Sequence, residues 1–196
     1  MVYKLPEWRS HLAGALHRSR AKPHSRYFQL ATVSPEGLPK NRTVVFRGFL
    51  QSSNQIQIIT DSRSDKVSQI AQQPAGEICW YFSKTREQFR FSGNLLLIDY
   101  QNNNSELIDA RQAAWQKISD NARSQFAWPK PGTTRTDNLN LFAPEIPSDQ
   151  EPLSTFCLLL FTPHQVDHLQ LRGEPQNRCL YHLQSNGDWT IEHINP

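Results

Sequence analysis

The sequence is poor in cysteine. It contains three cysteines, Cys79, Cys157 and Cys179, with neither a CxxC motif nor paired spacing. Each lies in an apolar run of the kind that forms strands, and their number is odd. This pattern predicts buried, reduced thiols rather than a disulfide framework, and we therefore expect a cytoplasmic protein.

Long apolar runs are absent as well. No segment approaches the roughly 20 consecutive apolar residues that span a bilayer. The first eight residues hold no apolar stretch long enough for a signal peptide. We therefore expect a protein that is neither exported nor partnered with a membrane.

Positive charge is present but is not concentrated. The 196 residues carry a formal net charge of +3 without a lysine- and arginine-rich run of the kind typical of nucleic-acid-binding arms. The glycine-rich signatures GxGxxG and GxxxxGK[ST] do not occur, which excludes the familiar nucleotide loops. This mild basicity fits a small anionic ligand, and we expect no nucleic-acid partner.

Patterns for metal binding and nucleophilic catalysis are weak. His164 and His168 have no further ligands at zinc spacing. Ser92 and Ser124 have no partnered histidine and aspartate pattern. We expect no metal site and no hydrolase triad, so an enzyme with this sequence would depend on a bound cofactor.

Hydrophobic patterns predict many short strands and few helices. Apolar residues spaced three and four apart predict helices at 7–20, 64–73 and 105–118. Runs rich in strand formers predict strands at 27–33, 41–49, 55–60, 76–82, 88–98, 155–162, 165–171, 178–183 and 189–194. We expect a mainly β fold, an antiparallel barrel with helical additions (α+β), in one domain covering residues 1–196.

Glycine and proline divide these runs. Ser34-Pro35-Glu36-Gly37 and Asn186-Gly187 predict hairpin turns, and Gly93 within a long strand predicts a bulge or a close backbone approach. The proline-rich tract at about 129–152 has little periodicity. A loop of this length is usually functional or a linker.

The segment from Arg42 to Lys66 carries the clearest chemical signal. An arginine stands near each end of an apolar strand, and a second apolar run leads into the start of a helix. A helix N-terminus favours phosphate, because its N–H groups are free and its partial charge is positive. Hydroxyl and cationic side chains there would add donors: Ser62, Arg63, Ser64 and Lys66. Solvated strand-end arginines and a surface helix capped by Ser62 or Ser64 remain alternatives.

Two further features of the strands bear on a ligand site. Arg42 and Arg47 are five residues apart, so a regular strand would point them to opposite faces. They would then bind different parts of one ligand or serve different purposes. A set of aromatic residues is expected in the core, with a ring-stacking ligand surface as the alternative: Trp80, Tyr81, Phe82, Phe89 and Phe91.

The order of these motifs resembles the FMN site of pyridoxamine 5'-phosphate oxidase-like proteins, which are FMN-binding split β-barrels. The resemblance covers nearly the whole chain and rests on order and spacing rather than on one motif. The matching segments are Arg42-Thr-Val-Val-Phe-Arg47, Ile59-Thr60, Ser64-Asp65-Lys66, the strand from Gln88 to Gly93, Leu171-Arg172-Gly173 and the segment from Arg178 to the end.

The resemblance implies a role for each matching residue. Arg42 and Lys66, helped by Ser64, would hold the FMN phosphate, and Arg47 would lie near the polar edge of the flavin ring. The flavin and its ribityl chain would be lined by Thr43, Val44, Val45, Ile59 and Thr60, with a hydrogen bond from Gln88. Arg178 would approach the flavin from a second subunit, because family members are homodimers with FMN at the interface.

The substrate side departs from the family pattern. Oxidases of the family have an Arg-x-His element just before the arginine matched by Arg178, but residues 173–177 contain neither arginine nor histidine. Of the tyrosine, arginine and serine that bind the substrate phosphate in those oxidases, only the serine is matched, by Ser124. Arg123 and Lys130 could supply a substitute anion site.

Together these residues predict an FMN-dependent oxidoreductase with an unknown small substrate. Three alternatives stay open. The chain could be a flavin-binding module without turnover, or a true pyridoxamine 5'-phosphate oxidase. It could also be a β-barrel that binds nucleic acid, which would be colourless and would bind in a salt-dependent way.

Overall fold

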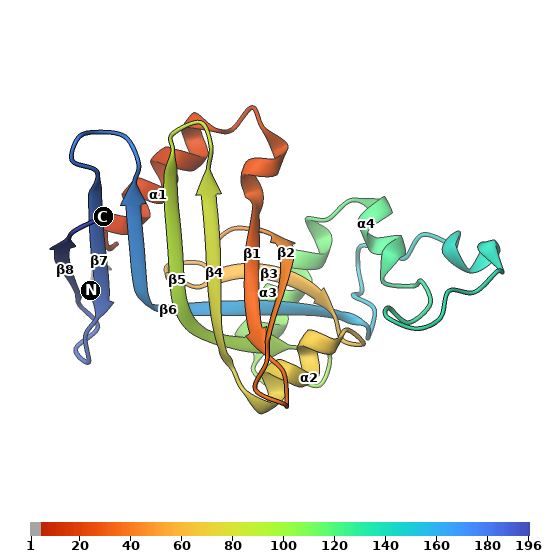
Figure 1. The fold of residues 1–196 in the computed structure, drawn as a ribbon. Coiled ribbons are helices and arrows are strands. Elements are labelled where there is room, and N and C mark those ends of the chain that lie inside the picture. Colours follow the sequence, from red (N-terminus) through yellow and green to blue (C-terminus); the bar gives the residue numbers. More distant parts are fainter. Residues whose placement is uncertain (1–4) are drawn as a thin grey trace.

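The structure, a computed structural model, describes residues 5–196 and is built on an antiparallel sheet of eight strands (Figure 1). The strands are β1 (Tyr27–Val33), β2 (Pro39–Val45), β3 (Ile56–Asp61), β4 (Ala75–Phe82), β5 (Glu87–Ile98), β6 (Phe156–Gln170), β7 (Asn177–Leu183) and β8 (Trp189–Ile194). The helices are α1 (Glu7–Arg18), α2 (Asp65–Gln72), α3 (Ser105–Gln116) and α4 (Asp120–Gln125), with the 3-10 helices η1 (Pro23–Arg26) and η2 (Leu139–Phe142). The predicted mainly β fold with helical additions is confirmed.

The sheet curls around its longest strand. The order of the strands is β2-β1-β4-β5-β6-β7-β8, and β3 pairs with β6 outside this path. The first half of β6 therefore lies between β3 and β5, and its second half lies between β5 and β7. An isolated bridge from Phe49 to Ile56 joins the segment after β2 to β3.

The prediction of two separate strands at 155–162 and 165–171 is wrong, because β6 is continuous. Pro163 has no N–H to donate, which favoured a break. In the structure Pro163 lies opposite Gly93, where the register of β5 and β6 shifts between Ser92 and Gly93. The bulge predicted at Gly93 is thus confirmed. A Cβ there would meet the Thr162 carbonyl oxygen and lie 2.8 Å from the Phe161 ring.

Helices α1 and α3 pack on opposite faces of β6, because Leu159 and Phe161 belong to the cluster with α1, and Leu158 and Leu160 to the cluster with α3. Trp8, Leu12 and Ala15 of α1 pack on a cluster of buried side chains from the strands. A second cluster joins α3 to β6 through Trp115 and Phe156. Among the described residues, none of the helices combines the length and apolarity that crossing a bilayer requires.

The aromatic prediction is confirmed for four of the five residues. Trp80, Phe82, Phe89 and Phe91 are buried, but Tyr81 is 48% exposed. Successive residues of a strand point to opposite faces, so Tyr81 lies on the face away from α1.

Other local predictions need correction. The three cysteines are free, as predicted, but only Cys157 is buried, while Cys79 and Cys179 are partly exposed. Ser64 precedes α2 as expected, yet its side chain makes no capping hydrogen bond. The short helix α4 was not predicted, since six residues are too few to show a helical period.

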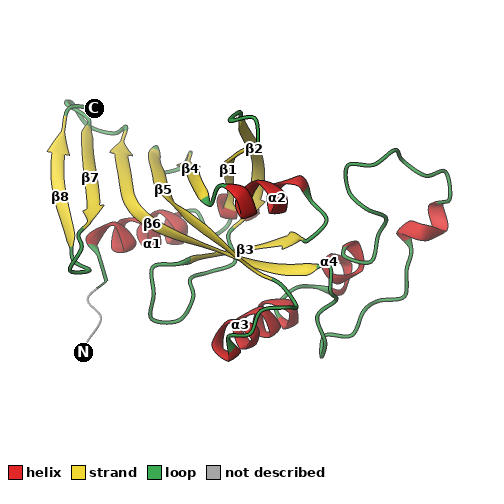
Figure 2. Cartoon of the chain, turned by 90° about the horizontal axis from the view of Figure 1, so that it is seen from below, coloured by secondary structure: helices red, strands yellow, loops and turns green. Residues whose placement is uncertain are grey.

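Residues 126–152, here called the arm, extend away from the sheet (Figures 1 and 2). Apart from η2, the arm has no regular secondary structure after α4, which confirms the predicted loop. Its start is fixed to the sheet, because Thr155 Oγ1 donates to the Phe126 carbonyl oxygen at 2.7 Å. Trp115 Nε1 holds its far end by donating to the Ser148 carbonyl oxygen at 2.8 Å.

Candidate functional site

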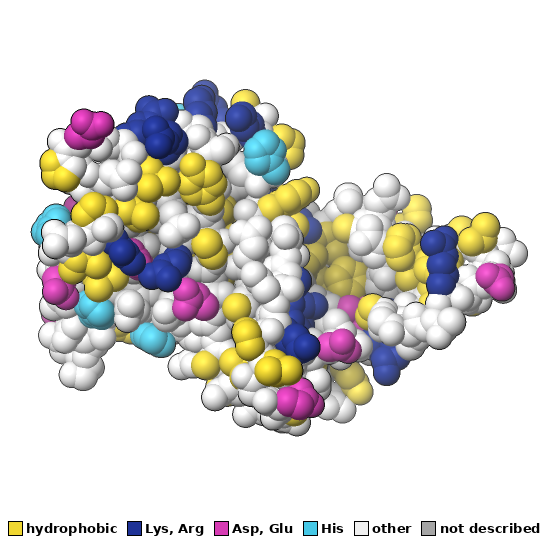
Figure 3. All heavy atoms as spheres, in the orientation of Figure 1, with side chains coloured by type: hydrophobic (Ala, Val, Ile, Leu, Met, Phe, Trp, Pro, Cys, Tyr) yellow, Lys and Arg dark blue, Asp and Glu magenta, His cyan; other side chains and the backbone are white. Residues whose placement is uncertain are grey.

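A pocket of about 860 Å³ opens between the sheet and the arm. Figure 3 shows it as a hollow with lysine and arginine side chains on both sides. One wall comes from β2, β3 and the start of α2, and the other from α4 and the arm. Nine of the predicted site residues line it: Arg42, Thr43, Val44, Val45, Arg47, Ile59, Thr60, Lys66 and Lys130.

Arg42 and Arg47 both line this pocket, although we expected them on opposite faces of one strand. That expectation assumed a regular strand over 41–49, but β2 ends at Val45. The Phe46 N–H bonds the Arg26 carbonyl oxygen, whereas the Arg47 N–H bonds the Gln57 carbonyl oxygen. The chain therefore changes partners between these residues, and Arg47 reaches the pocket from beyond the end of β2.

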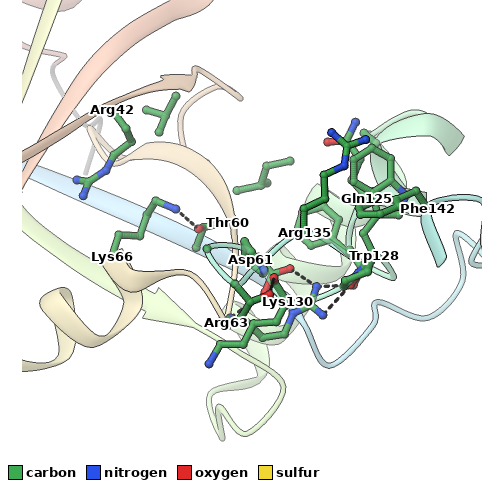
Figure 4. Close-up of a pocket in the computed structure, with 18 of the residues that line it drawn as sticks. Arg42, Thr60, Asp61, Arg63, Lys66, Gln125, Trp128, Lys130, Arg135 and Phe142 are labelled. Carbon is green, nitrogen blue, oxygen red and sulfur yellow. Dashed lines mark hydrogen bonds and ion pairs between the residues drawn. The ribbon is translucent and has the colours of Figure 1, made fainter. Parts of the chain in front are cut away.

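Lys66 lies at the first turn of α2 and points back toward the end of β3 (Figure 4). Its Nζ donates to Thr60 Oγ1 at 2.9 Å and to Ser64 Oγ at 3.0 Å. Ser64 does not line the pocket but reaches it through this contact. Burial lowers the pKa of Lys66, and the nearby Arg42 guanidinium lowers it further.

Arg42 is held from β1 and α2 by uncharged acceptors, namely the Leu30 carbonyl oxygen, Thr32 Oγ1 and Gln69 Oε1. Burial lowers the pKa of Arg42 as well. Among the ion pairs formed within residues 5–196, none includes Arg42 or Lys66. Two neighbouring cations, partly removed from water and without a carboxylate partner, form a site for an anion.

The residues of the pocket fit FMN. Its volume is within the range of roughly 300–1,000 Å³ that is usual for small-molecule sites. Arg42 and Lys66 provide charged donors for a phosphate at one end. Val44, Val45 and Ile59 offer apolar contact to a flat ring system, and further hydrogen-bonding groups lie beside them.

Arg63 has a different role from the one suggested by the sequence. Its guanidinium binds both carboxylate oxygens of Asp61, with Nη2 2.7 Å from Oδ2, and this contact raises the pKa of Arg63. It also donates to the carbonyl oxygens of Trp128 at 2.8 Å and Phe126 at 3.2 Å. Arg63 therefore ties the base of the arm to the end of β3, and its charge is already paired.

The arm contributes aromatic and cationic side chains to the second wall. The rings of Trp128 and Phe142 are 5.6 Å apart and nearly perpendicular, and Arg135 lies 5.9 Å from the Phe142 ring. Lys130 belongs to the same wall. The described lining holds six lysines and arginines but one carboxylate, Asp61, so the pocket is strongly positive.

The structure places four predicted site residues elsewhere. Arg123 is buried and ion-paired with Asp120, and it donates to the carbonyl oxygens of Ile118 and Pro147. Ser124 Oγ donates to the Asp120 carbonyl oxygen at 3.1 Å. Neither residue lines the pocket.

Gln88 and Arg178 also lie away from the pocket, on the face of the sheet opposite α1. Arg178 donates to both carboxylate oxygens of Asp167, at 3.0 and 2.7 Å, and Arg90 binds the same carboxylate. Burial would raise the pKa of Asp167, but the two arginines lower it overall. Arg178 is thus held on the face of β7 turned away from α1, because Cys179 and Tyr181, which point to the other face of the strand, pack in the cluster with α1. No helix lies over this part of the face in Figure 2, and we call it the uncovered sheet face.

Sequence reasoning missed Thr32, Gln69 and Trp128. Gln69 is buried on α2, one helical turn after Lys66, and this spacing was an available signal. Thr32 looked like an ordinary strand residue. Trp128 joins the pocket through the fold of the arm, which left no periodic signal.

Comparison with known proteins places this site in a family. Residues 5–99 match the model of the FMN-binding domain of pyridoxamine 5'-phosphate oxidase. A pyridoxine/pyridoxamine 5'-phosphate oxidase 2 of Arabidopsis thaliana is 37% identical over 193 residues, covering 96% of each chain. The chain belongs to the pyridoxamine 5'-phosphate oxidase family.

Solved structures agree with this assignment. A pyridoxamine 5'-phosphate oxidase-related, FMN-binding protein of Nostoc punctiforme is 55% identical, with a TM-score of 0.96 over 98% of this chain and 100% of that one. PhzG of Burkholderia lata shares the fold, with a TM-score of 0.79 at 17% identity over 99% and 96% of the two chains. FMN is therefore the cofactor of this oxidoreductase family and of this chain.

Proposed function

We propose that this chain is an FMN-dependent oxidoreductase that acts on a small anionic substrate in the pocket between the sheet and the arm. The observation that carries the proposal is the pair of half-buried cations, Arg42 and Lys66, without a carboxylate partner among the described residues. A phosphate dianion would satisfy both.

Each part of the pocket has a task in this proposal. Arg42 and Lys66, with Ser64 and Thr60 supporting Lys66, hold the phosphate. The wall formed by Thr43, Val44, Val45 and Ile59 carries the flavin. Bound FMN supplies the redox chemistry by accepting a hydride or two electrons from the substrate.

The remaining cations of the pocket suggest the charge of the substrate. Arg63 is neutralised by Asp61, and the phosphate of FMN would neutralise Arg42 and Lys66. Arg47, Lys130 and Arg135 then remain without a counter-charge in the pocket. An anionic substrate between the flavin and the arm would supply it.

The Arabidopsis relative makes pyridoxamine and pyridoxine 5'-phosphate the first substrates to test, because its name specifies oxidation of these compounds. The segment 173–177 of this chain lacks the Arg-x-His element that the resemblance led us to expect. Of the residues that bind the substrate phosphate in the family's oxidases, only Ser124 is matched, and it lies outside the pocket. Turnover of these substrates would therefore require Arg47, Lys130 or Arg135 to hold the phosphate group.

A homodimer is part of the proposal. Gln88 and Arg178, which the resemblance assigns to the flavin, lie on the uncovered sheet face and not at the pocket of their own chain. A second copy placed against this face could bring them to the flavin held by its partner. The site would then be incomplete in one chain alone.

Anaerobic mixing of FMN-loaded protein with pyridoxamine 5'-phosphate tests the function directly. We expect the absorbance of the oxidised flavin to fall as the substrate is oxidised. Pyridoxine 5'-phosphate and reduced nicotinamide cofactors serve as parallel donors. Bound FMN that none of these donors reduces would contradict an oxidase of these substrates and would favour the flavin-binding module.

A further inference from the structure

We infer that Thr32 and Gln69 position Arg42 for the phosphate of FMN. Neither residue lines the pocket, so their effect on the ligand would pass through the arginine. The inference rests on the proposed placement of the phosphate at Arg42 and Lys66, and it adds a second layer of residues to that site.

The hydrogen bonds of Arg42 form a closed arrangement. Its Nη1 donates to Thr32 Oγ1 at 2.6 Å and to the Leu30 carbonyl oxygen at 3.2 Å. Its Nη2 donates to Gln69 Oε1 at 3.1 Å. Thr32 Oγ1 in turn donates to the same Gln69 oxygen at 2.6 Å. Arg42, Thr32 and Gln69 therefore fix one another.

This arrangement leaves a defined part of the guanidinium available. An arginine has five N–H donors in a rigid plane. The three bonds occupy both donors of Nη1 and one donor of Nη2. The second Nη2 donor and the Nε donor remain, and they lie on one edge of the plane. Two parallel donors on one edge match two oxygens of a phosphate.

The burial of Thr32 and Gln69 favours a single position of the Arg42 guanidinium. Thr32 is 1% exposed and Gln69 is 7% exposed. Buried polar groups of this kind are costly unless they are hydrogen-bonded, and each is bonded here to the other and to Arg42. Rotation of the arginine away from this position would leave both without one of their partners.

The chemical type of the acceptors also matters. A carbonyl, a hydroxyl and an amide hold Arg42, and all three are uncharged. They orient the guanidinium without neutralising it. A carboxylate at the position of Gln69 would orient it equally well but would compete with the phosphate for its charge.

The test compares FMN with riboflavin, which lacks the phosphate. Dissociation constants are measured by flavin fluorescence for Thr32→Val, Gln69→Leu and Gln69→Glu. We expect each variant to bind FMN about tenfold more weakly, since the arginine loses its fixed orientation or its free charge. Binding of riboflavin should not change. Thr32→Ser keeps the hydroxyl and should restore FMN binding to the wild-type value.

Gln72→Leu provides the matched control, because Gln72 lies on the same helix and is exposed. It should bind both flavins as the wild type does. Equal losses for FMN and riboflavin in Thr32→Val and Gln69→Leu, or wild-type FMN affinity in both, would overturn the inference.

Arg42→Ala separates this inference from the proposed site. If Arg42→Ala weakens FMN binding while Thr32→Val and Gln69→Leu do not, the positioning role is wrong and the phosphate site stands. If Arg42→Ala binds FMN as the wild type does, the positioning role is wrong and so is the placement of the phosphate at Arg42. The double variant that combines Arg42→Ala with Gln69→Leu should bind FMN no more weakly than Arg42→Ala alone, because Gln69 acts through the arginine.

Discussion

The lowered pKa of Lys66 links its protonation to the binding of an anion. Burial and the Arg42 charge lower its pKa in the free protein from the ordinary value of 10.5. A bound phosphate would stabilise the protonated amine and raise the pKa again. Binding of FMN and protonation of Lys66 are therefore linked, and each favours the other.

This linkage predicts the pH dependence of FMN affinity. As the pH rises through the lowered pKa of Lys66, free protein loses the proton that the phosphate requires, so FMN should bind more weakly. The decline should begin below pH 10.5. Titrations of FMN from neutral to alkaline pH measure it. Lys66→Arg is the control, because a guanidinium keeps its charge throughout, and its affinity should not decline in the same way.

At the scale of single residues, the sequence predicted which side chains gather at the pocket better than how they are arranged there. The pocket collects Arg42, Thr60 and Lys66 as expected. The meeting of Arg42 and Arg47 at one pocket could not be predicted, because it depends on where β2 ends and β3 takes over the pairing. Likewise, nothing in the local sequence pattern shows that Arg63 forms an ion pair with Asp61 and hydrogen bonds to the arm.

Between secondary-structure elements, the buried carboxylate of Glu87 on β5 binds Arg18 at the end of α1. Glu87 lies 2.9 Å from His168 Nε2 and 2.8 Å from Arg18 Nη2. Burial tends to raise the pKa of Glu87, but these hydrogen bonds outweigh it and lower the pKa to about 2. Because the pKa is lowered in the folded state, the stabilisation is complete above the ordinary value of 4.5 and is lost as the pH falls toward 2.

Glu87→Gln tests this contribution. At neutral pH we expect the free energy of unfolding to fall by on the order of 3 kcal/mol, the equivalent of the pKa difference. The deficit relative to the wild type should shrink as the pH drops from 4.5 toward 2. Urea unfolding at a series of pH values measures both.

Glu77→Gln is the matched control on β4, since Glu77 is exposed and lies 3.9 Å from Arg90. An exposed pair contributes about 0–1 kcal/mol, so this variant should stay near the wild type. A deficit of Glu87→Gln that is constant from neutral pH to pH 2 would contradict the assigned pKa.

Strands and turns were predicted correctly where the signal lay within their own residues. The bounds of β1 and β8 match the sequence pattern, and the Asn186-Gly187 turn joins β7 to β8 as expected. The continuity of β6 was missed because the ladder passes Pro163 by a bulge against Gly93 on another strand. The bulge itself was predicted at Gly93, but its pairing with Pro163 is a property of the sheet that residues 155–171 alone do not show.

On the scale of the whole molecule, the proposed homodimer divides the site between two chains. Arg42 lines the pocket of its own chain, whereas Arg178 is held by Asp167 on the uncovered sheet face. If the partner supplies Arg178, variants of the two arginines can complement each other.

Mixing Arg42→Ala with Arg178→Ala tests this division. After subunit exchange at equal amounts, we expect tight FMN binding to return in about a quarter of all sites, because each mixed dimer regains one intact site. FMN binding at low concentration measures the gain, with each variant alone as the control. If mixing restores nothing although subunits exchange, the site lies within one chain.

We propose that Arg42 and Lys66 hold the phosphate of FMN, and the FMN dissociation constants of Arg42→Ala and Lys66→Ala test this directly. Loss of a charge-assisted hydrogen bond should cost roughly 1–3 kcal/mol in each variant, which corresponds to about 5- to 150-fold weaker binding. Riboflavin should bind both variants as it binds the wild type. Unchanged FMN affinity in both variants would contradict the claim.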